Sequence, residues 1–167
     1  SCGINTRCRI HIYFSVPYEP IPIKQTNLYK SIDQFNIPSS SKTILVAEDE
    51  NSNFVFLKAL FQKLNPDFKI VRAHDGQEVV EKCLAEKDID LVLMDIKMPV
   101  RNGYEATRII KEFRPGLPII AQTAYSTADA KNKALSAGCD AYISKPIDIV
   151  ILRAMLNKFL EAKKVTV

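Results

Sequence analysis

The chain has 167 residues and a formal net charge of +4; 47% of its residues are hydrophobic and 25% are charged. This profile is typical of a soluble globular protein, and no apolar run approaches the length needed to cross a bilayer. Basic residues form no stripe that would grip phosphate backbones, so we expect neither nucleic-acid binding nor membrane contact by this chain. The four scattered cysteines lack zinc-site spacing and suggest reduced thiols, as in the cytoplasm.

The first part of the chain contains one strand-like segment. Apolar side chains alternate with more polar ones at Ile10, Ile12, Phe14 and Val16, which is the period of a half-buried strand. Prolines then end the pattern, and the stretch up to residue 41 is rich in proline and serine, as linkers often are. One strand cannot form a domain. We therefore predict the trailing strand of a larger domain over residues 1–20, a linker over 21–41 and a separate domain over 42–163.

From residue 42 onward, short apolar runs alternate with segments of helical spacing. The runs, which we predict to be β-strands, are Ile44–Ala47, Phe68–Val71, Leu91–Met94, Ile119–Ala121 and Ala141–Ile143. The predicted helices lie around residues 57–64, 79–84, 106–113, 134–137 and 152–159, and Gly138 is expected to end the fourth of them. Strands that alternate with helices predict right-handed crossovers and an α/β fold with a parallel sheet covered on both faces.

The polar side chains that follow the strands are unusual. They are Glu48 and Asp49 after the first strand, Asp95 after the third, Thr123 after the fourth and Lys145 after the fifth. Ligands of open parallel sheets bind beyond the carboxyl ends of the strands, so we expect these groups to converge. The second strand runs only into Arg72, Ala73 and His74, which fits a peripheral position.

Converging carboxylates repel one another, by about 4 kcal/mol per pair at about 4 Å and an effective dielectric near 20. Lys145 supplies one compensating charge, and a hard cation with oxygen ligands, best suited by Mg²⁺, supplies the rest. One aspartate could then attack a phosphoryl group and form an acyl phosphate. Metal, ammonium and hydroxyl would stabilise the charge on the transferring oxygens.

Four stretches carry a resemblance to a known family. ILVAEDE, LVLMDIKMP followed by NG, IIAQTA and AYISKP resemble the response-regulator receiver domains of two-component signalling, over nearly all of residues 42–163. The resemblance implies the flavodoxin-like receiver fold, a five-stranded parallel sheet in the order 2-1-3-4-5 with helices on both faces. It also implies a phosphoacceptor module of a phosphorelay, which promotes its own phosphorylation and dephosphorylation without being a conventional enzyme and signals by changing conformation.

The resemblance assigns roles at the acidic site. Asp95 would be the phosphoacceptor. Asp49, Asp95 and the backbone carbonyl of Lys97 would bind Mg²⁺ directly, while Glu48 would act through water. Glu48 stands where an aspartate is commoner, and we expect it to keep this role. Asn102 likewise stands where an aspartate often precedes the glycine, and either residue can cap the helix that begins there.

The resemblance also assigns the switch and the partner surface. Thr123 and Lys145 would contact phosphoryl oxygens, and Tyr142 would be the switch aromatic that follows Thr123. The partner would be a histidine kinase domain or a histidine phosphotransfer protein, docked at Asn53, Phe56 and Pro146. Phe56 could equally be a core residue, and a weak homodimer is a further option.

A second likeness concerns the parent protein. Residues 12–18, IYFSVPY, resemble the last strand of a histidine-kinase ATPase domain. This implies the C-terminal receiver of a hybrid sensor histidine kinase, cytoplasmic itself although its parent could be membrane-anchored. We expect its output to pass through a partner or through the preceding kinase.

Three alternatives remain. A phosphatase of the haloacid-dehalogenase type needs a second acid two residues after the nucleophile, where this chain has Lys97. A flavin or nucleotide carrier needs a phosphate-binding loop after the first strand, where Glu48 and Asp49 would repel phosphate. A receiver that has lost phosphorylation could serve as a docking module, but its site would not be expected to stay intact.

Overall fold

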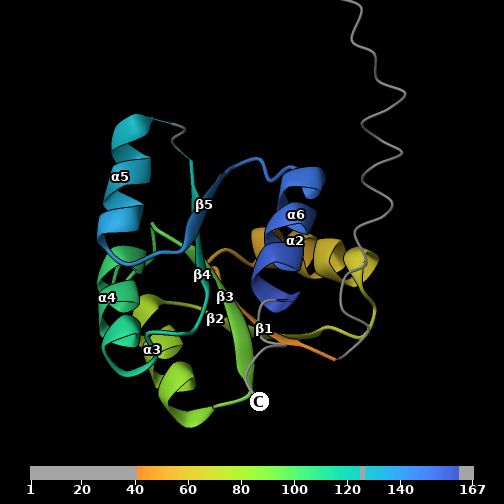
Figure 1. Ribbon diagram of the computed structural model, residues 1–167, viewed down its shortest axis with the longest axis horizontal. Coiled ribbons are helices and arrows are strands. Elements are labelled where there is room, and N and C mark those ends of the chain that lie inside the picture. Colours follow the sequence, from red (N-terminus) through yellow and green to blue (C-terminus); the bar gives the residue numbers. More distant parts are fainter. Residues whose placement is uncertain (1–40, 125–126, 162–167) are drawn as a thin grey trace, which may run out of the picture.

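The computed structural model describes residues 41–124 and 127–161 (Figure 1). The strand predicted within residues 1–20, and the linker except residue 41, lie outside these residues. In chain order the elements are β1 (Thr43–Ala47), α2 (Asn51–Leu64), β2 (Lys69–Ala73), α3 (Gly76–Ala85), β3 (Ile89–Asp95), α4 (Gly103–Phe113), β4 (Ile119–Thr123), α5 (Ala128–Ser136), β5 (Ala141–Ser144) and α6 (Ile149–Glu161). Every strand and helix predicted after residue 42 is confirmed.

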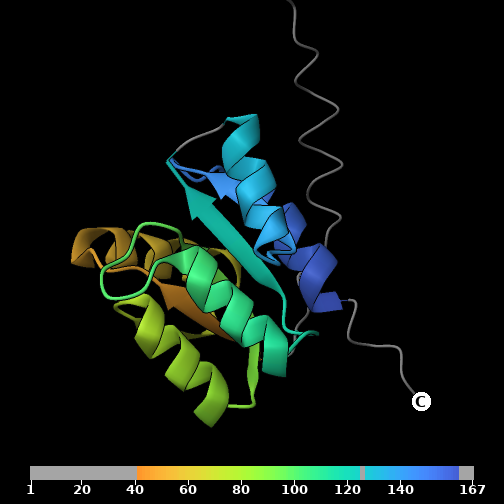
Figure 2. The same cartoon turned by 90° about the vertical axis from the view of Figure 1, so that its left-hand side faces the viewer.

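The strands form one parallel sheet in the order β2-β1-β3-β4-β5, as predicted. Helices α3, α4 and α5 cover one face, and α2 and α6 cover the other (Figure 1). Figure 2 turns the first of these faces toward the viewer. Among the described residues, no helix combines the length and apolar character that crossing a membrane requires.

Each strand contributes side chains to the hydrophobic core on both faces of the sheet. In β1, Leu45 and Ala47 pack toward α3 and α4, whereas Ile44 and Val46 pack toward α2 and α6. Because both faces of the sheet are buried, both sets of alternating positions must be apolar. This is why the strands are visible in the sequence as continuous apolar runs.

The second strand differs in its bounds from the prediction Phe68–Val71. It begins at Lys69 and continues through Arg72 to Ala73. Phe68 is buried just before the strand, with its ring in edge contact with Phe61 at a centroid distance of 6.5 Å. The apolar run therefore included a core residue that belongs to the preceding turn.

The predicted helix ends are confirmed at two points. The Asn102 side chain accepts a hydrogen bond from the backbone N–H of Glu105 and so caps α4. Gly138 has φ +101° and follows α5, whose last carbonyls accept from Gly138 and Cys139. This pairing is the Schellman motif, in which a left-handed residue ends the helix.

Candidate functional site

The register of the strands aligns three polar side chains in one row. Met94 pairs with Ala47, and Asp95 pairs with Gln122. Glu48, which follows Ala47, therefore lies beside Asp95. Because successive residues of a strand alternate between faces, Glu48, Asp95 and Gln122 all lie on the side of α2 and α6.

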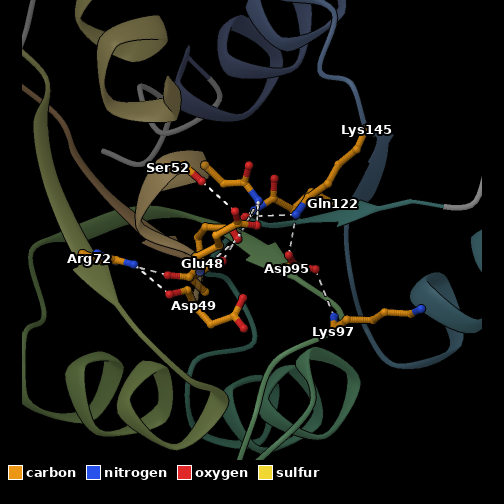
Figure 3. Close-up of polar contacts among 11 residues, drawn as sticks. Glu48, Asp49, Ser52, Arg72, Asp95, Lys97, Gln122 and Lys145 are labelled. Atoms are coloured by element: carbon orange, nitrogen blue, oxygen red, sulfur yellow. Dashed lines mark hydrogen bonds and ion pairs between the residues drawn. The ribbon is translucent and has the colours of Figure 1, made fainter. Parts of the chain in front are cut away.

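Asp95 ends β3 with its carboxylate held from two sides. Its Oδ1 accepts from the backbone N–H of Lys97 at 3.0 Å, and its Oδ2 accepts from Lys145 Nζ at 2.5 Å (Figure 3). A Cβ at Gly103 would lie 2.2 Å from the backbone oxygen of Asp95, so glycine lets α4 begin against the end of β3. The loop thereby fixes the direction of the Asp95 side chain.

Glu48 is only 1% exposed, and its carboxylate accepts from four donors. Oε1 accepts from the backbone of Glu50 at 3.3 Å and from Asn53 Nδ2 at 3.2 Å. Oε2 accepts from Lys145 Nζ at 3.0 Å and from Gln122 Nε2 at 3.3 Å. Lys145 therefore bridges Glu48 and Asp95.

The electrostatics of Lys145 favour its charged form. Burial alone would lower the pKa of its ammonium group, but the hydrogen bonds and charges of Asp95 and Glu48 outweigh burial and raise the pKa above its usual value. Lys145 is therefore a fixed positive charge against the carboxylates at neutral pH.

The acidic residues form a donor set that fits a magnesium ion. Glu48, Asp49 and Asp95 each offer a carboxylate oxygen, and these oxygens lie within 4.8 Å of one another. Asp49 is exposed while Glu48 and Asp95 are buried, so the cluster opens to solvent on one side. Lys145 balances only part of its negative charge. Hard oxygen ligands, surplus negative charge and an open side are what Mg²⁺ prefers in proteins.

Two residues that sequence reasoning did not assign support this site. Arg72 of β2 donates to the backbone carbonyls of Glu48 and Asp49, at 3.1 and 2.9 Å (Figure 3). Its guanidinium also lies 4.7 Å from the centroid of the Phe54 ring. It thus fixes the loop that carries the acidic pair. Gln122 is fully buried beside Glu48. Its signal in the sequence was a polar residue that continues the apolar run at 119–121.

The predicted phosphate-contacting and switch residues lie at the adjoining strand ends. Thr123 is buried and lines a cleft of about 920 Å³ together with Asp95 and Lys145. Its carbonyl also accepts from the backbone N–H of Lys145 at 2.8 Å. Tyr142 pairs with Ala121, two residues before Thr123, so Tyr142 and Thr123 share the face of α3, α4 and α5. Tyr142 is half-buried, and Lys131 Nζ lies 5.6 Å from its ring centroid.

The three predicted partner-binding residues line one hollow. Asn53, Phe56 and Pro146 surround a cavity of about 420 Å³, which Glu48 and Lys145 also line. Phe56 is 57% exposed, so the reading of Phe56 as a core residue is wrong. The hollow therefore places an exposed aromatic ring next to the buried acid of the site.

Comparison with known proteins gives one consistent result. A model of the response regulator receiver domain family matches residues 44–157. The chemotaxis protein CheY of Halobacterium salinarum is 42% identical over 108 residues, covering 64% of this chain and 86% of that protein. Hybrid signal transduction histidine kinase G of Dictyostelium discoideum is 36% identical over 131 residues, covering 77% of this chain but 4% of the kinase. The chain spans about a quarter or less of the larger curated relatives it matches.

Solved structures agree with these sequences. The receiver domain of the sensor histidine kinase PA1611 from Pseudomonas aeruginosa, with a magnesium ion coordinated in its active-site cleft, matches with a TM-score of 0.66 and 30% identity over 73% of this chain and 99% of that one. The receiver domain of Ssk1, crystallised with the Saccharomyces cerevisiae phosphotransfer protein Ypd1, matches with a TM-score of 0.68 and 26% identity over 75% and 92%.

Proposed function

This chain belongs to the response regulator receiver domain family, and from that premise we propose that Asp95 is the residue that accepts the phosphoryl group. The observation that carries the proposal is the convergence of Lys145 on Asp95 and Glu48 within the three-carboxylate cluster. A carboxylate that ends a buried strand, faces a cleft and is paired with a fixed ammonium is suited to nucleophilic attack on phosphorus.

The phosphoryl donor is a phosphohistidine. The donor's other ring nitrogen carries a proton, so that when one carboxylate oxygen of Asp95 attacks the phosphorus and the P–N bond breaks, the electron pair stays on the departing nitrogen and the imidazole leaves uncharged. The product is an acyl phosphate on Asp95 and a neutral histidine on the donor. Lys145 balances the charge on the transferring oxygens. Asp49, Asp95 and the backbone carbonyl of Lys97 would hold Mg²⁺, with Glu48 acting through water. When bound, the ion supplies the remaining positive charge that phosphoryl transfer needs.

The phosphorylated state would be reported through Thr123 and Tyr142. The Thr123 hydroxyl moves toward a phosphoryl oxygen, and the half-buried Tyr142 turns into the space behind it. The surface formed by α5, β5 and α6 then changes. This proposal is supported by the placement of both side chains on one face of neighbouring strands.

The donor would dock at the hollow of Asn53, Phe56 and Pro146. A histidine-bearing helix must approach Asp95, and this hollow adjoins the site through Glu48 and Lys145. Phe56 supplies an exposed apolar anchor. A complex of a receiver domain with a phosphotransfer protein, Ssk1 with Ypd1, supports a partner of this kind.

The parent protein would be a hybrid histidine kinase, with this receiver over residues 42–163 and the end of the ATPase domain within residues 1–20. Several relatives of the chain are hybrid histidine kinases, which supports this origin. A cytoplasmic location of the receiver follows from it. The sequence of the parent gene upstream of Ser1 tests this proposal: an encoded ATP-binding domain would support it, and a different domain would contradict it.

Two rival functions fit the site less well. A haloacid-dehalogenase-type phosphatase needs an acid at position 97, where the Lys97 side chain extends away from the carboxylates (Figure 3). A docking module without phosphorylation would not need Lys145, Asp95 and the acidic pair to be kept in contact. Phosphoryl acceptance is the function that uses all of these groups.

The experiment is direct phosphorylation. Incubation with Mg²⁺ and acetyl phosphate should add one phosphoryl group that hydroxylamine removes. Asp95→Asn should abolish labelling, whereas Asp88→Asn, which alters an exposed surface carboxylate, should label normally. Mass spectrometry of the intact protein measures both. Undiminished labelling of Asp95→Asn would contradict the assignment.

A further inference from the structure

We propose that Gln122 is a positioning residue, which keeps the Glu48 carboxylate aimed at the metal site while Lys145 turns to the phosphoryl group. The inference rests on the proposed function of Asp95 and extends it to a residue outside the acidic cluster.

The orientation of the Gln122 amide is fixed by its neighbours. Its Nε2 lies 3.3 Å from Glu48 Oε2 and 3.5 Å from the backbone oxygen of Ala47. The backbone oxygen of Ala47 can only accept, and Glu48 Oε2 also accepts from the Lys145 ammonium. Only the NH₂ group can face them. Gln122 is therefore a hydrogen-bond donor to Glu48.

The donors on Glu48 divide into fixed and movable ones. An ionised carboxylate offers about four lone-pair sites, and four donors occupy those of Glu48. The donors to Oε1 are the backbone N–H of Glu50 and the side chain of Asn53 in the first turn of α2, and neither contacts Asp95. Of the two donors to Oε2, Lys145 also contacts Asp95, so Lys145 is the one that can leave Glu48 when Mg²⁺ or a phosphoryl group binds at Asp95. Gln122 then remains on Oε2, and one acceptor site becomes available for a water molecule on the metal.

The strand order explains the length of both side chains. Glu48 follows β1, Gln122 lies on β4, and β3 with Asp95 runs between them. Two long side chains are needed to meet across the intervening strand. An aspartate at position 48 would be one methylene shorter and would lose the contact. The contact with Gln122 thus explains why position 48 carries a glutamate and not the shorter aspartate.

The Gln122 amide does not contribute to the stability of the fold. Gln122 is fully buried, and its Oε1 has no hydrogen-bond partner among the residues that the structure describes. A buried acceptor without a partner destabilises the folded state, whereas an apolar residue of the same shape would not. The residue therefore serves the carboxylate at the expense of stability.

The primary test is Gln122→Met, which keeps the length of the side chain and removes its donor. Calorimetric titration should give roughly tenfold weaker Mg²⁺ binding, as for other partners that orient metal-site carboxylates, and labelling by acetyl phosphate should slow. The thermal unfolding midpoint of the metal-free variant should be unchanged or higher. Asn157→Leu is the matched control, because Asn157 is a buried amide on α6 whose polar atoms also lack partners in the described chain. It should leave Mg²⁺ affinity unchanged.

A double-mutant cycle separates positioning from structure. In a Glu48→Asp background the contact is already lost, so adding Gln122→Met should change Mg²⁺ affinity less than twofold. In the metal-free protein, the NMR signals of the Gln122 side-chain amide should shift on Glu48→Asp, and this comparison holds even if Gln122→Met fails to fold. The proposal would be overturned if Gln122→Met lowered Mg²⁺ affinity equally in the wild-type and Glu48→Asp backgrounds. It would also be overturned if the Gln122 amide signals did not shift on Glu48→Asp.

The outcomes distinguish this inference from the proposed function. If the wild-type protein neither binds Mg²⁺ nor takes up phosphate at Asp95, the proposed function fails and the inference with it. If the wild type does both, and Gln122→Met matches it in affinity and rate, the function stands and Gln122 has no positioning role. A loss of affinity together with a matching loss of metal-free stability would also contradict the inference.

Discussion

Lys145 stands between two carboxylates, with its ammonium 3.0 Å from Glu48 Oε2 and 2.5 Å from Asp95 Oδ2. Without the ammonium, Glu48, Asp49 and Asp95 would repel one another with no internal compensation. The residue therefore contributes to stability as well as to the proposed chemistry.

We expect Lys145→Met to lower the free energy of unfolding of the metal-free protein by on the order of 1–3 kcal/mol, and Mg²⁺ to restore part of the loss. Thermal unfolding in the presence and absence of chelator measures both effects. Lys82→Met is the control, because Lys82 has similar exposure but makes a single helical pair with Glu78. Such pairs contribute about 0.3–0.5 kcal/mol. Equal losses in the two variants would contradict the role of Lys145.

The pH dependence of this stabilisation has a definite sign. The pKa of Lys145 is raised in the folded state by its two carboxylate partners, against the opposing effect of burial. A raised pKa stabilises the fold fully below the unfolded value of 10.5 and ceases to do so as pH rises through the higher folded value. The stability difference between wild type and Lys145→Met should therefore stay constant from about pH 7 to about pH 9.5 and shrink above 10.5. If the stability difference already shrinks as the pH is raised from about 7 to about 8, this account of Lys145 is contradicted.

At the scale of elements, the site depends on loops that pass close to helix starts. Gly76 begins α3, and a Cβ there would lie 2.2 Å from the backbone oxygen of Arg101 in the loop after β3. Arg101 also donates to Gln77 Oε1, so the loop that follows Asp95 is tied to α3. The helix start and the site loop are therefore packed as one unit.

Gly76→Ala should destabilise the protein by about 1–3 kcal/mol, because the backbone of the Arg101 loop must shift to admit the methyl group. Gly116→Ala provides the control, since a Cβ at Gly116 meets no atom within 4 Å. It should be neutral or raise stability by up to about 1 kcal/mol, because alanine restricts the unfolded chain. Chemical denaturation measures both. Equal effects would show that the close approach is not maintained in solution.

The exposed face of α2 gives a prediction about the donor. Phe56→Ala should slow phosphoryl transfer from a phosphorylated histidine phosphotransfer protein, because an exposed ring beside the site is an apolar anchor for a docking helix. Labelling by acetyl phosphate should be unchanged, since that small molecule needs no docking surface. Leu84→Ala is the control, as Leu84 is equally exposed at 57% but belongs to α3. If both donors slow together, Phe56 supports the fold and not the partner.

The proposed switch would connect the two faces of the sheet. Thr123→Ala should still accept phosphate, because Asp95 and Lys145 are untouched. It should respond less on α5, β5 and α6, because the hydroxyl that follows the phosphoryl oxygen is gone. Coupling of this kind is typically worth about 1–3 kcal/mol. NMR shifts with and without the phosphoryl mimic beryllofluoride measure it. Undiminished shifts around Tyr142 in the variant would rule out this route.

Much of this architecture could be predicted from the sequence, for identifiable reasons. The strands are buried on both faces, so their apolar runs located them, and the carboxyl ends of parallel strands identified Asp95, Thr123 and Lys145 as neighbours. The roles of Arg72 and Gln122 could not be predicted from the sequence because they depend on which strands lie side by side. Arg72 reaches the acidic loop only because β2 borders β1, and Gln122 meets Glu48 only through the register of β1, β3 and β4. The bounds of β2 were misplaced because Phe68 is a core residue outside the strand.

The neighbours Gln122 and Thr123 face opposite sides of the sheet, one toward Glu48 and the other toward the face that carries Tyr142. A shift of β4 by one residue would exchange the two, because the side-chain period of a strand is two. An amide would then stand where the proposed switch needs a hydroxyl, and a hydroxyl too short to reach Glu48 would replace the amide. Inserting or deleting one residue between Ile119 and Thr123 should therefore disrupt the site more than a substitution within β4. Length changes in this lineage should accumulate in the loops that flank the strand, where they leave that alternation undisturbed.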